Sequence, residues 1–120
     1  EEKKRFSEIS RCLECTEYHK GSSWEIAEVQ NVTAGDLMSE VLVFEKENLL
    51  LVTALNPEQT LRTASMVDAL GVVLVNGKSP NEKMISLARE LSISLLSTPN
   101  SMFDTCVALS NLSSTAGCGA

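Results

Sequence analysis

Val72-Val73-Leu74-Val75-Asn76-Gly77-Lys78-Ser79-Pro80 is the stretch that decides the fold of this chain, because four aliphatic residues run directly into a polar turn that opens a helix. The pattern occurs twice more: Leu49–Val52 runs into Thr53-Ala54-Leu55-Asn56-Pro57, and Ile93–Leu96 runs into Ser97-Thr98-Pro99-Asn100. All three prolines of the chain fall at these junctions, where the first helical position tolerates a missing N–H. Strands that alternate with helices predict an α/β fold with a mainly parallel sheet flanked by helices.

The junctions also predict where the helices begin and end. We expect Asn56, Ser79 and Thr98 to be N-caps, and Ser79 with Glu82 forms a capping box. Gly71 is the expected C-cap of the first of these helices, over residues 57–70. This helix should turn four apolar side chains toward the sheet: Leu61, Ala64, Met66 and Val67.

The first part of the chain is patterned less sharply. We expect a helix over residues 3–13, a short strand over 14–19 and a second extended stretch over 26–32. Asp36 is then expected to cap a helix whose buried stripe is Leu37, Val41 and Phe44.

Composition places the chain among globular domains and excludes several classes of function. The 120 residues fit one domain, which we expect to span residues 1–112, followed by a flexible tail over 113–120. The net charge of −6 and the five aromatic residues count against nucleic-acid binding. No run of apolar residues is long enough to cross a membrane, and no signal peptide is visible. The four cysteines are expected to be free thiols in a cytoplasmic protein.

Parallel strands bring their polar turns together beyond their carboxyl ends, and any binding site is expected at that edge of the sheet. Gly77-Lys78-Ser79 resembles the end of a phosphate-binding loop, but Val72 stands where that motif needs its first glycine, and Pro80 removes an N–H. We expect an ordinary capped helix at this point, with an anion bound at its N terminus as the alternative. The residues expected to contact a ligand are Asp36, Thr53, Asn56, Asn76, Lys78, Ser79 and Thr98.

Cys12, Cys15 and His19 raise the alternative of a metal or redox site, because two thiols at this spacing and an imidazole can supply three zinc ligands. The two cysteines lie near the end of the expected helix, where the helix dipole opposes thiolate formation. They equally suit two half-buried small apolar side chains, and we expect no metal and no cofactor. His19 is the only histidine and no nucleophile motif accompanies it, so we expect no catalytic residues.

Several short blocks, in order, resemble DRTGG domains. The first is Ala34-Gly35-Asp36-Leu37-Met38-Ser39-Glu40-Val41-Leu42, at the start of a helix. The likeness covers roughly residues 6–112. Its further blocks are Leu51-Val52-Thr53, Val72-Val73-Leu74-Val75-Asn76-Gly77 with Pro80, Leu87-Ala88-Arg89-Glu90, Ile93-Ser94-Leu95-Leu96-Ser97-Thr98 and Phe103-Asp104-Thr105.

This resemblance implies an α/β fold like that of the N-terminal domain of HPr kinase/phosphorylase. DRTGG domains accompany phosphotransacetylases and nucleotide-regulated pyrophosphatases as regulatory or dimerisation modules, and some stand alone. The chain departs from the family after Thr53, where it reads Ala54-Leu55-Asn56-Pro57-Glu58 in place of the polar segment that gives the family its name. The resemblance therefore carries no ligand site at these positions.

Together, these observations predict a non-catalytic regulatory or interaction domain that acts through homodimerisation or by docking to a partner enzyme. The alternative is a small-molecule sensor that binds a nucleotide or phosphorylated metabolite at the carboxyl edge of the sheet. The four methionines suit an adaptable interface or a core, and we expect most of them in the core: Met38, Met66, Met84 and Met102.

Overall fold

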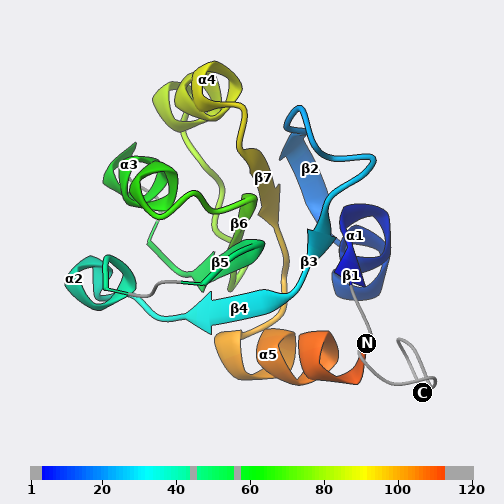
Figure 1. The fold of residues 1–120 in the computed structure, drawn as a ribbon. Coiled ribbons are helices and arrows are strands. Elements are labelled where there is room, and N and C mark those ends of the chain that lie inside the picture. The colour runs from blue at the N-terminus through cyan, green and yellow to red at the C-terminus, as the bar shows by residue number, and fades with distance from the viewer. Residues whose placement is uncertain (1–3, 44–45, 56–57, 113–120) are drawn as a thin grey trace.

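A computed structural model describes residues 4–43, 46–55 and 58–112 (Figure 1). Its centre is a five-stranded sheet in the order β2-β7-β6-β5-β4. The last four of these strands are parallel to one another, and β2 pairs with β7 in the antiparallel direction. The expected α/β fold with a mainly parallel sheet is therefore confirmed. The strands are β2 (Thr16–His19), β4 (Asn31–Ala34), β5 (Leu49–Thr53), β6 (Gly71–Leu74) and β7 (Ser94–Ser97).

Helices cover both faces of the sheet (Figure 1). On one face lie α2 (Met38–Val41), α3 (Glu58–Met66) and α4 (Glu82–Leu91), and on the other lie α1 (Phe6–Leu13) and α5 (Met102–Asn111). Every described residue of β5, β6 and β7 is buried, as continuous apolar strands between two helical layers should be. Successive side chains of β5 point to opposite faces of the sheet, so the core has two parts. Leu49 and Leu51 pack with α3 and α4, and Leu50 and Val52 pack with α1 and α5.

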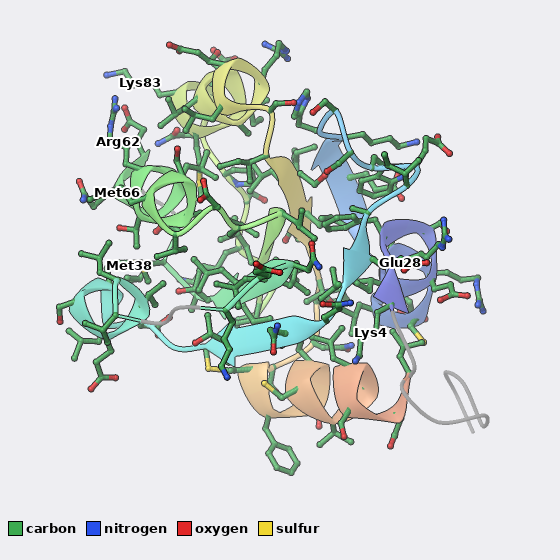
Figure 2. All side chains as sticks on the ribbon, viewed as in Figure 1. Lys4, Glu28, Met38, Arg62, Met66 and Lys83 are labelled. Atoms are coloured by element: carbon green, nitrogen blue, oxygen red, sulfur yellow. The ribbon has the colours of Figure 1, made fainter. Side chains whose placement is uncertain are left out.

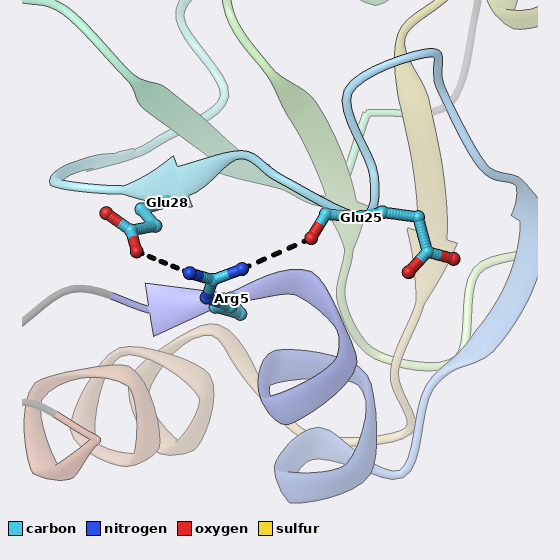
Figure 3. Close-up of polar contacts among 3 residues, drawn as sticks. All are labelled: Arg5, Glu25 and Glu28. Carbon is cyan, nitrogen blue, oxygen red and sulfur yellow. Dashed lines mark hydrogen bonds and ion pairs between the residues drawn. The ribbon is translucent and has the colours of Figure 1, made fainter.

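A short two-stranded sheet ties the start of the chain to the segment before β4. It pairs β1 (Lys4–Arg5) with β3 (Glu28–Val29) in the antiparallel direction. The Arg5 guanidinium donates to the Glu28 carboxylate at 2.8 Å and to the carbonyl oxygen of Glu25 at 3.2 Å (Figure 3). Beside it, the rings of Phe6 and Trp24 stack with their centroids 5.1 Å apart. These contacts hold the segment between β2 and β3 against α1.

Two of the expected helix N-caps are wrong. The N-cap of α4 is Asn81, whose Oδ1 accepts from the Met84 N–H at 2.8 Å, and the N-cap of α5 is Ser101. Ser79 and Thr98 lie earlier, in turns that run further than expected before each helix begins. The Gly77 N–H donates to the Thr98 carbonyl at 2.9 Å, so the two turns are bonded to each other. The third expected cap, Asn56, lies outside the described residues.

Asp36 and Gly71 also differ from expectation. The helix after β4 begins at Met38, its N-cap Leu37 makes no side-chain cap bond, and Asp36 bonds elsewhere. Gly71 is the first residue of β6 and not a C-cap, because α3 ends earlier, before a left-handed residue at Asp68 (φ 56). The expected helical position of Phe44 and the expected tail over 113–120 lie outside the described residues.

None of the helices within the described ranges is both long enough and apolar enough to cross a membrane.

Candidate functional site

The polar turns after the parallel strands meet at one edge of the sheet, as the sequence predicts. The register pairs Thr53 with Leu74 and Leu74 with Ser97, so the last residues of β5, β6 and β7 lie level with one another. The Gly35 N–H donates to the Val52 carbonyl at 3.0 Å, which places the end of β4 at the same edge. We call this edge, with the turns at residues 35–36, 53–55, 75–79 and 97–100, the carboxyl rim.

Asp36 and Thr53 form a clasp between the ends of β4 and β5. The Asp36 Oδ1 accepts from the Thr53 hydroxyl at 2.7 Å and from the Ala54 N–H at 2.8 Å. The Thr53 hydroxyl oxygen in turn accepts from the Leu55 N–H at 3.2 Å, and the Thr53 side chain is fully buried. The Thr53 hydroxyl therefore donates its proton to Asp36 within the protein and not to a ligand.

Thr98 has a similar structural role on the other side of the rim. Its side chain is fully buried and its hydroxyl donates to the carbonyl oxygen of Leu13 at 2.5 Å, which ties the end of α1 to the end of β7. The neighbouring Ser97, which we did not predict as a rim residue, donates its hydroxyl to the Lys78 carbonyl at 2.5 Å. Nothing local in the sequence signals either bond, because the paired residues are 85 and 19 positions apart.

Asn76, Lys78 and Ser79 are exposed, as is Asp36 of the predicted set. Asn76 and Gly77 both adopt positive φ, of 60° and 67°, so the turn doubles back before the chain reaches α4. The N terminus of α4 consequently begins after Asn81, and Gly77-Lys78-Ser79 does not lie on it. The expected anion site at a helix beginning at Ser79 is therefore wrong in its placement.

Cys15 lacks the lowered pKa that is typical of a reactive thiol. Burial, with the nearby Glu17 carboxylate, raises the pKa of the Cys15 thiol to about 12, so it stays protonated and does not offer a thiolate. Burial and the positive charge of Arg89 lower the pKa of His19. No group of three His, Cys, Asp or Glu side chains able to hold a metal occurs in the portion of the chain that the structure covers.

A hollow at the opposite edge of the sheet was not predicted. It has a volume of about 640 Å³ and lies at the amino ends of β5 and β6, beside α2 and α3. Met66 and Leu42 line it and are 69% and 42% exposed, and Val43, the residue after Leu42, is 75% exposed. We call these apolar residues and the hollow the Met66 surface. The lining residues are Leu42, Lys46, Glu47, Asn48, Met66, Val67, Asp68 and Leu70.

The expectation that Met66 faces the sheet is wrong, although Leu61 and Ala64 of the same helix are buried as expected. Each residue of an α-helix turns about 100° around its axis, so Met66 lies roughly 200° beyond Ala64, on the outer side. Of the other methionines, Met84 is fully buried and Met38 and Met102 pack against the two cores. Counting the helical angle from the two buried positions would have found the exposed methionine.

Among solved structures, this fold is similar to the crystal structure of the CBS and DRTGG domains of the regulatory region of Clostridium perfringens pyrophosphatase, complexed with its activator, diadenosine tetraphosphate. The TM-score is 0.73 at 13% sequence identity. The match covers 86% of this chain and 44% of that one, so the chain spans less than half the length of the structure that it resembles.

At this level of identity the match establishes a shared fold, and the resemblance to DRTGG domains is confirmed in that sense. The similar structure belongs to a regulatory region. The sequence itself matches neither a protein-family model nor a curated protein.

Proposed function

We propose that this chain is a non-catalytic regulatory module that acts through homodimerisation, with docking to a partner enzyme as the other form of the same function. The Met66 surface carries the proposal. Single exposed apolar residues are normal on a monomer, but here Leu42 and Met66 line the same hollow, and Val43 follows Leu42 in the chain. Such a patch is typical of a surface that is covered in the working state of a protein.

Two further observations support an interaction module. The buried hydroxyls of Thr53 and Thr98 at the carboxyl rim donate within the protein, which leaves few side chains for recognising a substrate. The fold is also similar to that of a pyrophosphatase regulatory region. We assign the function to residues 1–112 as one module.

Sedimentation velocity over a wide range of protein concentrations tests the homodimer. The expected result is a rise in mass from 13.0 kDa toward twice that value as the concentration increases. A mass that stays at 13.0 kDa throughout would contradict the homodimer.

A second candidate function is a sensor of a nucleotide or phosphorylated metabolite at the carboxyl rim. It is supported by the activator, diadenosine tetraphosphate, in the similar structure and by the exposed Asn76, Lys78 and Ser79. Asp36, Thr53 and Thr98 would shape the rim behind them, and the predicted contact from Asn56 remains part of this proposal.

A thermal-shift screen with nucleotides and phosphorylated metabolites tests the sensor. A ligand present at about 100 times its Kd adds about 2.7 kcal/mol of stability, and Lys78→Ala should reduce that gain. If no compound raises the Tm, the sensor function is rejected.

A further inference from the structure

We propose that β4 binds an extended peptide segment of a partner protein, which adds to the sheet as a further strand along the free side of β4. The middle of this segment is uncharged and partly apolar, and its flanks are basic. The site uses none of the residues of the Met66 surface, so this inference goes beyond the proposed homodimer and does not depend on it.

The backbone hydrogen bonds of β4 alternate between its two sides. The N–H groups of Asn31 and Gly35 donate, at 3.2 and 3.0 Å, to carbonyl oxygens on the side of β5. In a parallel pair every second residue bonds to the neighbouring strand, so Val32 and Ala34 direct their N–H and C=O groups away from β5. Among the strands that the structure describes, only β5 pairs with β4. The free side of β4 therefore offers main-chain donors and acceptors that an extended peptide can pair with.

The strand at the other end of the sheet, β2, is protected against such pairing. It carries Glu17, which forms an ion pair with Lys20, and its register with β7 is irregular between Glu17 and His19. Charged side chains and irregular register are common ways in which proteins block an edge strand. By contrast, β4 has the sequence Asn-Val-Thr-Ala, pairs with β5 in unbroken register and contains no charged residue and no proline. Of these two strands, β4 is the one suited to receive a partner strand.

A hollow of about 380 Å³ lies between β4 and α5, which run beside each other (Figure 1). Alternate side chains of an added strand point to the α5 face of the sheet, where they can enter this hollow. Two apolar residues one turn apart on α5 extend the surface, because Phe103 and Val107 are 75% and 42% exposed. The residues that line the hollow are Gln30, Val32 and Ala34 on the strand side and Cys106, Leu109 and Ser110 on α5.

Charge favours an uncharged segment of a basic partner over a second copy of this chain. Of the described residues that line the hollow, only Lys4 is charged; it lies where β4 begins and is 8% exposed (Figure 2). A charged side chain in the middle of the peptide would lose hydration there without an exposed opposite charge to replace it. The net charge of −6 attracts basic residues on the flanks of the peptide and repels a second copy.

A synthetic peptide of this chemistry tests whether the site exists. The probe has two lysines at each end and alternating threonine and valine between them, and it carries a fluorescent label. Anisotropy titrations should show saturable binding to the parent chain. A control peptide with proline in place of each valine should not bind, because it cannot pair as a strand.

Ala34→Pro tests the main-chain contact. It removes an N–H that points away from β5 and leaves the hydrogen bonds between β4 and β5 in place. The peptide Kd should rise by about tenfold or more, because a carbonyl of the bound peptide loses its donor. Ala34→Ser is the matched control, since it changes the side chain and keeps the N–H, and it should bind as the parent does.

Ser110→Trp tests the hollow. An indole on this exposed position of α5 should fill the hollow and weaken peptide binding. Ser86→Trp is the matched control, because Ser86 is exposed on α4, in the opposite helical layer, and it should leave the Kd unchanged. Circular dichroism checks that all variants fold.

Amide exchange in the parent chain locates the bound peptide without any substitution. The peptide should slow the exchange of the Val32 and Ala34 amides. If Ala34→Pro does not fold, this measurement decides the question, and exchange that the peptide leaves unchanged overturns the inference.

The remaining outcomes separate this site from the proposed function. No binding at millimolar concentrations of the peptide, or binding that Ala34→Pro leaves unchanged, overturns the inference and leaves the homodimer standing. A parent dimer that Ala34→Pro dissociates would show that a second copy covers β4. Binding only to a chain cut after Leu112 would show that residues 113–120 cover it, and either result overturns the partner peptide.

Discussion

Replacing Thr98 by valine should destabilise the protein although Thr98 touches no ligand in our interpretation. The two side chains have nearly the same shape, so the change removes a hydroxyl and opens no cavity. The parent hydroxyl donates to the Leu13 carbonyl at 2.5 Å and accepts from the Asn100 N–H at 3.3 Å. Leu13 and Thr98 are both 0% exposed.

The expected cost follows from the group that is left without a partner. A buried carbonyl that loses its hydrogen bond costs about 1–3 kcal/mol, whereas the long contact from Asn100 adds little. For a domain near this size, each kcal/mol lowers the Tm by roughly 4–8 °C. Thr98→Ser keeps the hydroxyl and removes a methyl group, so it should cost about 0.8 kcal/mol.

Urea unfolding of the parent and both variants, followed by circular dichroism, measures these costs. The expected order of stability is parent, then Thr98→Ser, then Thr98→Val, with self-association unchanged. A valine variant that matches the parent in stability would refute the structural role of this hydroxyl. If that variant also lost a thermal shift given by a nucleotide, Thr98 would instead be a ligand contact.

Three further predictions concern other parts of the fold. Gly71→Ala should lower the unfolding free energy by about 1–3 kcal/mol in urea titrations, because the new Cβ would lie 2.8 Å from Phe6 Cε1; an unchanged midpoint would contradict the packing. In a variant that keeps only Cys15, alkylation of this thiol at mildly alkaline pH should be slower in the folded protein than in the protein unfolded by urea. The unfolding free energy should fall as the pH rises from 9.0, where the thiol of the unfolded chain ionises, toward about 12, the pKa of the thiol in the folded protein. Arg5→Ala should cost less than about 1 kcal/mol in the same titrations, since its ion pair with Glu28 is 49% and 32% exposed; a larger loss would show that β1 depends on it.

The order of strands and helices could be predicted because it depends on local composition. The apolar runs at Leu49–Val52, Val72–Val75 and Ile93–Leu96 each became a buried strand to within one residue at either end. Their burial on both faces follows from uninterrupted aliphatic residues, which a half-exposed strand would not tolerate. Each apolar run therefore indicates by itself that its strand is buried on both faces.

The starts of the helices could not be predicted, because each junction offers several capping residues. Ser79 and Asn81 are both good N-caps, and so are Thr98 and Ser101. The choice depends on how far each turn runs, and the bond from the Gly77 N–H to the Thr98 carbonyl joins two turns distant in the chain. Local sequence does not contain that information.

Convergence of the rim residues could be predicted from parallel strands, but their roles could not. Thr53 and Asp36 were expected to face a ligand, and they bond to each other across 17 residues. A threonine that donates to a ligand and one that donates to a neighbouring turn have the same local sequence. Only the partner, visible in the structure, distinguishes them.

The two edges of the sheet therefore differ in the interactions still open to them. The carboxyl edge, where parallel sheets commonly bind ligands, satisfies its buried hydroxyls through Asp36, Leu13 and Lys78. The amino edge leaves Leu42 and Met66 exposed beside a hollow, next to the exposed Val43. Polar groups that are already paired gain little from a new partner, whereas exposed apolar area gains from any surface that excludes water. We therefore place the proposed interaction of this chain at the Met66 surface.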